Sequence, residues 1–405
     1  MPELVKPESE AQLVDLLHWA LAGKKRLGIE GLGTNRDFAY EPSADITVSM
    51  QGLHGIIDYQ PGELVMTARA GTPRAVIDAA LAEHRQHLAF EPPAFGRPDG
   101  RDARSGSIGG VFMANLSGPR RFTAGAARDH LLGVRGVSGR GEVWKSGGRV
   151  IKNVTGYDLS KLMAGSWGTL SALTELTFKV LPAPPLSASL LLPVAKPQSA
   201  FALMSRLARN PSQPSGLAYL CAPVAARLET PVVASGGENV CVARVEGTGS
   251  AVRERIANLR TVLRGTQKLK VLDDAESRRL WSGIRDVHGL ADYPVILRIS
   301  LPPFRARELV AEWPGPGSSR PWYADAAGGC IWMGLEVDPA TVFISQLRRQ
   351  LAGAASVVVF RAPDHVKRAA GVFPIQPAPL AGLSRRIKHS FDPEQILNAG
   401  RLGPI

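Results

Sequence analysis

SIGGVFMANLSGPRRFTAGAARD, residues 107–129, is the stretch from which we predict the fold. Glycine and other small residues alternate with polar ones along it. It holds too much glycine for a core segment and too many apolar residues for a flexible linker. Because glycine lets the backbone approach a ligand closely, the composition favours a backbone pressed against a large, flat, polar ligand. A structured glycine loop without a ligand is the alternative.

A second glycine motif comes earlier, where Gly31-Leu32-Gly33-Thr34-Asn35 follows a strand predicted over residues 26–30. Glycines at the end of a strand allow successive backbone N–H groups to form a concave nest for phosphate oxygens. The motif is neither the GxGxxG dinucleotide fingerprint nor the GxxxxGK[ST] P-loop. Taken alone, it fits an ordinary turn equally well.

A third motif is GGRVIKNVTGYDLSKLMAGSWGTL, residues 147–170. A strand leads into Lys152-Asn153, and a short helix then begins near Gly156. Backbone groups near Val150 and Ile151 could pair with the edge of an adenine. The start of the helix could offer N–H groups to an anion.

Local signals predict the elements around these motifs. Ser9 and Gln12 form a capping-box pattern before apolar residues at helical spacing, and Gly23 suits the end of that helix. Residues 131–137 and 142–145 flank a glycine-rich turn and predict a β-hairpin. Residues 170–180 alternate between apolar and more polar side chains, which predicts a half-buried strand.

Prolines at 182, 184 and 185 mark a boundary, and the pattern changes beyond it. Strands and helices then follow one another twice in a similar order. The predicted strands cover 186–193, 216–221, 239–246, 294–301, 321–325, 330–337 and 356–361, and the helices 197–209, 249–264, 304–312 and 339–352. This doubled βαββα unit predicts an antiparallel sheet backed by helices.

Charge and cysteine content limit the partners of the chain. The net charge is +12, from 48 Lys and Arg against 36 Asp and Glu, but the basic residues are scattered. We therefore expect a solvated basic surface and no nucleic-acid partner. The single, widely separated Cys221, Cys241 and Cys330 argue against zinc or iron–sulfur ligation by this chain. Buried free thiols fit the cytoplasm, and the N-terminus lacks the pattern of a signal peptide.

The three glycine motifs, in this order and spacing, resemble the FAD-binding domain of the vanillyl-alcohol-oxidase type, also called the PCMH type. FEPPAFG at 90–96, residues 116–170 and FDPEQILNAGR at 391–401 more narrowly resemble the FAD-binding subunit of bacterial glycolate oxidase. The resemblance implies an α+β protein. Its parts would be a two-part PCMH-type FAD-binding domain (1–185), an α+β cap domain on the substrate side (186–382) and a C-terminal segment returning to the FAD domain (383–405).

The resemblance also implies which residues would contact FAD, motif by motif. The pyrophosphate would be cradled by Gly31, Leu32, Gly33, Thr34 and Asn35. The flavin ring and ribityl chain would meet Pro92, Pro93, Gly109, Gly110, Asn115, Ser117, Gly118, Gly125 and Asp129. The adenine would meet Val150 and Ile151, and Asn398 and Arg401 would return to the flavin side from the C-terminus.

Departures from the family pattern refine these expectations. Several members attach FAD covalently through a histidine near the first glycine loop; this loop has none, so we expect non-covalent, dissociable FAD. The metal-binding HxGDGNxH motif of related hydroxy-acid dehydrogenases is absent, and residues 328–334 in its place read GGCIWMG. We therefore expect no metal site, and no catalytic base is identified.

Few side chains remain as candidates for chemistry. His130 follows Arg128-Asp129 and is either a base near the flavin or a buried, hydrogen-bonded histidine. Arg298 and Arg361, on predicted strands of the cap domain, either bind a carboxylate by bidentate pairing or are structural.

The leading hypothesis is an FAD-binding redox subunit of a glycolate oxidase complex. It would oxidise glycolate to glyoxylate and pass electrons to an acceptor other than a nicotinamide. The implied partners are a second flavoprotein subunit, an iron–sulfur subunit and a small hydroxy-acid substrate, in the cytoplasm, with peripheral attachment to the inner face of the cell membrane left open. Two alternatives remain: a self-sufficient FAD-dependent dehydrogenase of another small alcohol or hydroxy acid, and an assembly subunit whose flavin is not catalytic.

Overall fold

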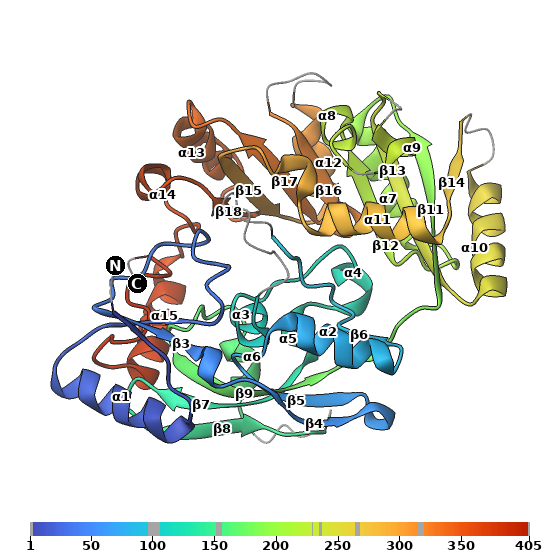
Figure 1. Cartoon of the computed structure of the whole chain (residues 1–405). Coiled ribbons are helices and arrows are strands. Elements are labelled where there is room, and N and C mark those ends of the chain that lie inside the picture. The colour runs from blue at the N-terminus through green and yellow to red at the C-terminus, as the bar shows by residue number, and fades with distance from the viewer. Residues whose placement is uncertain are drawn as a thin grey trace. The chain divides into compact units, whose positions relative to one another are not determined.

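The computed structural model describes residues 3–95, 106–150, 156–228, 230–234, 237–263, 268–313 and 320–403 (Figure 1). Contacts divide the chain into two compact units. The first contains Met1–Ser117, Gly125–Ala183 and Ile375–Ile405, and the second contains Gly118–Ala124 and Pro184–Pro374. The domain limits expected from the sequence stay predictions.

The first unit begins with a small parallel sheet and one helix. Strands β1 (Glu3–Val5), β3 (Ile46–Ser49) and β2 (Leu27–Glu30) pair in the order β1-β3-β2. Helix α1 (Glu10–Ala22) begins as predicted, because Ser9 Oγ accepts the N–H of Gln12 at 3.2 Å, and Gly23 caps its end. Its buried leucines pack with apolar residues of β2 and β3 in one core.

A five-stranded antiparallel sheet forms the rest of the framework of this unit. Its order is β4-β5-β9-β7-β8, with bounds Ile56–Gln60, Val65–Arg69, Ser171–Lys179, Leu131–Ser138 and Val143–Gly147. The pairing of β7 with β8 confirms the predicted hairpin. Figure 1 shows the helices beside this sheet, which are α2 (Arg74–Glu83), α3 (Ile108–Met113), α5 (Ala127–His130) and α6 (Leu159–Met163). A two-stranded ribbon joins β6 (Gln86–His87) to β10 (Leu181–Pro182).

The C-terminus belongs to the first unit. Helix α15 (Ala378–Phe391) ends at Asp392, and the following residues pair with β2 through a bridge between Leu27 and Leu397. Lys388 is buried on α15, where its ammonium donates to the carbonyl of Thr169 at 2.6 Å and binds the Asp392 carboxylate. This buried pair fixes the segment that carries Asn398 and Arg401.

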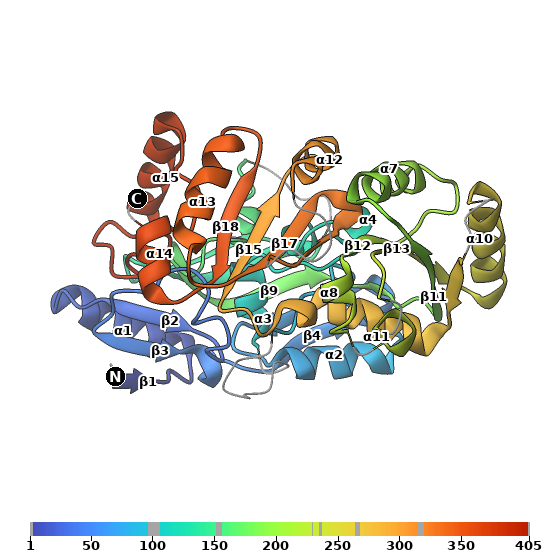
Figure 2. The same ribbon diagram turned by 90° about the horizontal axis from the view of Figure 1, so that it is seen from above.

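The second unit is built on an eight-stranded antiparallel sheet of order β14-β11-β13-β12-β16-β17-β15-β18. Figure 2 shows most of these strands side by side in that order. The bounds are β11 Leu186–Pro193, β12 Gly216–Leu220, β13 Val240–Gly247, β14 Lys270–Leu272, β15 Val295–Ser300, β16 Trp322–Asp325, β17 Cys330–Leu335 and β18 Ser356–Arg361. The two halves meet at the β12–β16 pair, so the doubled unit predicted from the sequence is confirmed.

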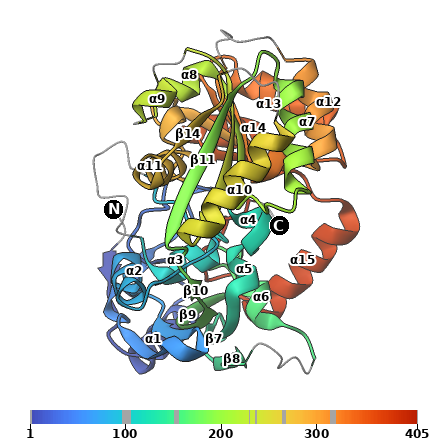
Figure 3. The same cartoon turned by 90° about the vertical axis from the view of Figure 1, so that its right-hand side faces the viewer.

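Helices cover both faces of this sheet. The expected helices are α7 (Pro197–Ala208), α10 (Gly249–Val262), α12 (Pro303–Ala311) and α13 (Ala340–Gln350). Helices α11 (Asp274–Arg285) and α14 (Asp364–Ala370) were not predicted from the sequence. Shorter helices are α4 (Arg121–Ala124), α8 (Ala222–Ala225) and α9 (Pro231–Ala234). Figure 3 shows α7 and α11 on opposite sides of the strands.

The two faces of the sheet differ in chemistry. Alternation along a strand sends neighbouring side chains to opposite faces. On β15, Leu297 and Ile299 therefore share the apolar face with Tyr219 and Trp322, which α7 covers through Phe201. The opposite face carries polar and charged side chains, and α11 packs against part of it.

Candidate functional site

The first two glycine motifs lie against each other in the first unit. A Cβ placed on Gly31 would lie 2.0 Å from Ser107 Oγ, so only glycine fits there. A Cβ on Gly106 would lie 3.3 Å from Thr34 Oγ1, and one on Gly110 would lie 3.8 Å from Asn35 Nδ2. Residues 31–35 and 106–110 thus lie next to each other in space, although they are far apart in the sequence.

The backbone of residues 31–35 presents hydrogen-bond donors. Within the described part of the chain, no group accepts a hydrogen bond from the amides of Leu32, Thr34 or Asn35. The carbonyl side is held by Arg401, whose guanidinium donates to Asn35 O at 2.5 Å and to Tyr40 O at 2.9 Å. A loop with bound carbonyls and open amides fits an anionic group such as a pyrophosphate.

Asn398 joins strand β2, which leads into this loop, to the third motif. Its amide Nδ2 donates to Ile29 O at 3.1 Å and to Trp167 O at 2.7 Å, and its Oδ1 accepts the N–H of Ile29 at 2.7 Å. Gly168 has a φ of 73°, and a Cβ there would lie 2.6 Å from Asn398 Nδ2. Asn398 therefore acts on the backbone of the glycine loops, which is a positioning role.

Arg401 is also a positioning residue. Its guanidinium lies 5.4 Å from the centre of the Trp167 ring, and burial lowers its pKa to about 10. It donates to backbone carbonyls of the loop that begins at Gly31. The structure thus brings Arg401 and Asn398 together with residues 31–35 and the turn at Trp167.

The polar side chains of the middle motif bind backbone amides. Asn115 Oδ1 accepts the N–H of Arg128 at 3.1 Å, and Ser117 Oγ accepts that of Ala127 at 2.9 Å. Asp129 Oδ2 accepts the N–H of Ala126 at 2.8 Å, next to Gly125, which has a φ of 86°. These contacts fix the shape of residues 115–129.

The close approach at Gly109 is to protein backbone. A Cβ there would lie 2.7 Å from the carbonyl oxygen of Ala70. Packing against Ala70 therefore accounts for the glycine at this position. For the other glycines of the motif, close contact with FAD stays a prediction.

The remaining expected residues lie in varied surroundings. Pro92 and Pro93 are buried, and their carbonyls accept hydrogen bonds from Arg74 Nη1 at 2.8 and 3.1 Å. Val150 is 58% exposed after β8, and Ile151 lies outside the described residues. Gly118 begins the short segment that groups with the second unit. Direct contact of all these residues with FAD stays a prediction.

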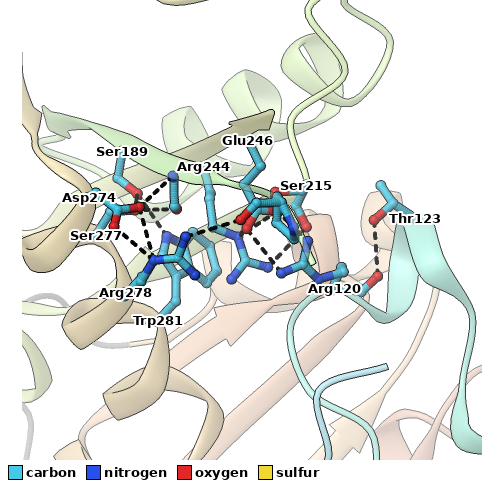
Figure 4. Close-up of polar contacts among 12 residues, drawn as sticks. Arg120, Thr123, Ser189, Ser215, Arg244, Glu246, Asp274, Ser277, Arg278 and Trp281 are labelled. Carbon is cyan, nitrogen blue, oxygen red and sulfur yellow. Dashed lines mark hydrogen bonds and ion pairs between the residues drawn. The ribbon is translucent and has the colours of Figure 1, made fainter. Parts of the chain in front are cut away.

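The segment Gly118–Ala124 is anchored to β13 of the second unit by an ion pair (Figure 4). Arg120 Nη2 donates to Glu246 Oε1 at 3.0 Å, and Arg244 Nε lies 3.7 Å from the same carboxylate. Burial raises the pKa of Glu246, but Arg244 and Arg120 outweigh it and leave that pKa below its usual value. This cluster was not predicted from the sequence.

The guanidinium of Arg244 continues this network toward α11. It stacks 4.5 Å from the centre of the Trp281 ring, and Trp281 Nε1 donates to Ser189 Oγ at 2.8 Å. Figure 4 shows these groups in a row that ends at Asp274 and Arg278 on α11. These contacts join β11, β13 and α11 of the second unit.

The polar face also carries a second cluster on β15, β16 and β17. Arg298 lies 5.6 Å from the centre of the Trp332 ring and hydrogen-bonds Cys330. Asp325 is 5% exposed, and burial raises its pKa to about 6 against the opposing effects of Arg298, Cys330 and Trp332. Asp325 was missed in the sequence, where no local motif surrounds it.

Arg361 and His130, two of the candidates for chemistry, both contact backbone carbonyls. Arg361 Nη2 donates to the carbonyls of Ala291 at 2.5 Å and Tyr293 at 2.9 Å. His130 is fully buried, and its Nδ1 lies 3.2 Å from the carbonyl oxygen of Lys179. The three cysteines are buried free thiols, as expected. Among the described residues, no cluster of three metal-ligating side chains occurs.

Comparisons with known proteins bear on this architecture. A family model described as an FAD binding domain matches residues 2–147. Glycolate oxidase subunit GlcE of Escherichia coli (strain K12) is 32% identical over 395 residues, which cover 96% of each chain. Glycolate oxidase subunit GlcD of Bacillus subtilis (strain 168) is 32% identical over 162 residues, 40% of this chain and 33% of that protein.

Solved structures share the fold. A crystal structure of p-cresol methylhydroxylase with substrate bound superposes with a TM-score of 0.73 at 15% identity, over 99% of this chain and 88% of that one. This likeness confirms the predicted α+β fold of the PCMH type. Among the described residues, no helix has both the length and the apolar character needed to cross a membrane.

Proposed function

We propose a function from one premise: the chain belongs to the family of FAD-binding oxidoreductase subunits that includes GlcE of glycolate oxidase. Its cofactor is FAD, and it is an oxidoreductase subunit acting on CH–OH donors. The substrate we propose is glycolate, which would be oxidised to glyoxylate with electrons leaving to an acceptor other than a nicotinamide. The observation that carries this proposal is the match to GlcE along 96% of both chains.

Residues 31–35 would hold the pyrophosphate of FAD. Their open amides and the fixed carbonyl side give that loop the donors that an anion needs. Residues 106–110 would lie beside it, and Asn398 and Arg401 would keep the loops in place. When bound, FAD supplies the two-electron acceptor for oxidation of the alcohol carbon. Because no histidine occurs in the loop, the cofactor would be dissociable.

We further propose that the chain works with a second flavoprotein subunit and an iron–sulfur subunit. GlcE and GlcD, which are both similar to this chain, are named as subunits of glycolate oxidase. The chain has no CxxC pattern of its own, so an iron–sulfur cluster would come from a partner. The buried free thiols support a reducing compartment, which suggests the cytoplasm, with any membrane attachment made through a partner.

One observation favours a second candidate function, a dehydrogenase that binds and oxidises its own hydroxy acid. Arg298 and Asp325 place a cation and a carboxylate on the same face of one sheet. Such a pair could serve a substrate without help from another subunit.

A visible absorption spectrum tests both candidates. The purified chain should show a flavin spectrum, and acid precipitation should release the colour into the supernatant. Bleaching by glycolate in the isolated chain would favour the second candidate, whereas bleaching only in the presence of partner subunits would favour the first. A colourless chain that fails to take up added FAD would overturn the assignment of the cofactor site.

A further inference from the structure

Arg298 and Asp325 lie on the same face of the second unit's sheet, with one strand between them. Arg298 of β15 pairs with Trp332 of β17, and Asp325 of β16 pairs with Cys330 of the same strand. Residues directly opposite one another share a face, and Cys330 and Trp332 are two residues apart. Because β17 lies between them, the Cα atoms of β15 and β16 are roughly 10 Å apart. The side chains of Arg298 and Asp325 span part of that distance.

Within the described residues, no carboxylate lies within ion-pair distance of the Arg298 guanidinium, although the charge of Asp325 acts on it from farther away. The guanidinium contacts the Cys330 thiol and the face of Trp332, and its Nε is buried without a hydrogen-bond acceptor. A guanidinium carries five N–H donors. A partly buried cation with an unpaired N–H donor is costly unless an acceptor binds that donor.

Two other arginines of the same unit have oxygen acceptors for their guanidinium groups. Arg348 donates to three backbone carbonyls, those of Val357, Ala370 and Val372. Arg120 Nε is also buried without an acceptor, but the two terminal nitrogens of Arg120 donate to the carboxylate of Glu246. Arg298 therefore differs from both in having no carboxylate or carbonyl oxygen as a hydrogen-bond acceptor among the described residues.

Asp325 supplies the complementary group. Its carboxylate is almost completely buried and accepts hydrogen bonds from Cys330 and Trp332. A carboxylate has about four lone-pair sites, so it can accept a further donor. A ligand that meets both residues needs an anionic group at one end and a hydroxyl at the other.

We propose that Arg298 and Asp325 form a recognition site for a small 2-hydroxy acid. Arg298 binds its carboxylate, and Asp325 accepts a hydrogen bond from its hydroxyl. The planar guanidinium, held against the Trp332 ring, matches the two carboxylate oxygens. The inference rests on the proposed function, because it assigns a substrate site to a chain of that family.

The test is calorimetric titration of the full FAD-loaded chain with glycolate, acetate and inorganic phosphate. The wild type should bind glycolate more tightly than acetate, which lacks the hydroxyl. Arg298→Gln should weaken glycolate binding at least tenfold, and Arg298→Lys should restore only part of it, since lysine keeps the charge and loses the fork. Asp325→Asn should reduce the preference for glycolate over acetate.

Arg305→Gln is the matched control, because Arg305 is an exposed arginine of the same unit paired with Glu308. It should bind glycolate as the wild type does. Equal binding of glycolate by the wild type and Arg298→Gln would overturn the proposal, as would phosphate binding as tight as that of glycolate. If Arg298→Gln does not fold, Arg298→Lys takes its place. A partial loss of glycolate binding in Arg298→Lys supports the proposal, and binding equal to that of the wild type overturns it.

The flavin spectrum of each variant separates this proposal from the proposed function. Loss of glycolate binding to Arg298→Gln with FAD fully retained supports the recognition site. A chain that binds FAD and supports glycolate oxidation in the complex, yet binds glycolate independently of Arg298, overturns the recognition site alone. Failure of the wild type to bind FAD overturns the proposed function instead.

Discussion

Arg120 and Glu246 form an ion pair in which the two side chains are only 12% and 8% exposed. Arg120 lies in the Gly118–Ala124 segment, between Ser117 and Gly125 of the middle glycine motif. Its two terminal nitrogens both donate to the Glu246 carboxylate. The Gly118–Ala124 segment is therefore anchored to β13 within the second unit.

Replacing Arg120 with alanine should strongly destabilise the protein. The variant would leave Glu246 buried with Arg244 as its remaining charged neighbour, and loss of one partner of a buried pair costs about 3–5 kcal/mol. Urea unfolding should show this loss. Lys268→Ala is the matched control, because Lys268 pairs with Glu238 where the side chains are 68% and 44% exposed. Such a surface pair contributes about 0–1 kcal/mol, so equal losses in the two variants would contradict a buried anchor.

Gly31→Ala should weaken FAD binding at least tenfold, or about 1.4 kcal/mol. The new Cβ would lie 2.0 Å from Ser107 Oγ and 2.9 Å from Ser107 Cβ, so the loop or the turn at 106–110 must move. Titration of the apoprotein with FAD measures the effect. Adding Ser107→Gly should recover part of the affinity by removing the obstacle.

Gly62→Ala is the control for this prediction. A Cβ on Gly62 would meet nothing within 4 Å, so FAD affinity should stay at the wild-type value. Wild-type affinity in Gly31→Ala would mean that residues 31–35 do not carry the pyrophosphate.

Lys388→Ala should destabilise the first unit and weaken FAD binding together. Asp392 is fully buried, and without the ammonium its carboxylate would keep only the N–H groups of Ile396 and Leu397. The expected loss is about 3–5 kcal/mol. Because Asn398 and Arg401 follow this segment, FAD titration should report a parallel loss of affinity. Arg385→Ala, an exposed site on the same helix, should change neither quantity, and unaltered FAD affinity in Lys388→Ala would show that the loops hold without this pair.

Local sequence signals predict the secondary structure of short segments. The start of α1 was predicted because its cap, Ser9, lies beside the residues that it serves. Helix α11 was missed because Ser277 and Gly283 occupy buried positions that apolar residues usually fill, although Asp273 and Glu276 form a capping box that announces its start.

Groups that act across the chain are harder to predict. Asn398 acts on Ile29, far away in the sequence, and only the family resemblance suggested that it returns to the glycine loops. Asp325 owes its surroundings to strand pairing. Neither Arg298 nor Cys330 is identifiable as its neighbour before β15, β16 and β17 are placed in order.

The Asp325 carboxyl gives the last prediction, which concerns pH. Burial raises its pKa from 3.8 to about 6, although Arg298, Cys330, Trp332 and Arg121 all oppose the shift. Tyr323 and Cys330, the other acids of the cluster, have pKa values raised by burial, that of Cys330 to about 12, so they stay neutral below pH 8.

Because the folded state prefers the protonated carboxyl, the favourable contribution of Asp325 is complete below about pH 4 and is lost as the pH rises through 6. Asp325→Asn cannot titrate. Its free energy of unfolding, relative to the wild type, should therefore rise by about 3 kcal/mol between pH 4 and pH 7, at about 1.4 kcal/mol per unit of pKa shift, and then level off. Urea unfolding at intervals of one pH unit measures this difference. A difference that stays flat, or falls as the pH rises, would show that the native carboxylate is already stabilised, with no need for a ligand hydroxyl to satisfy it.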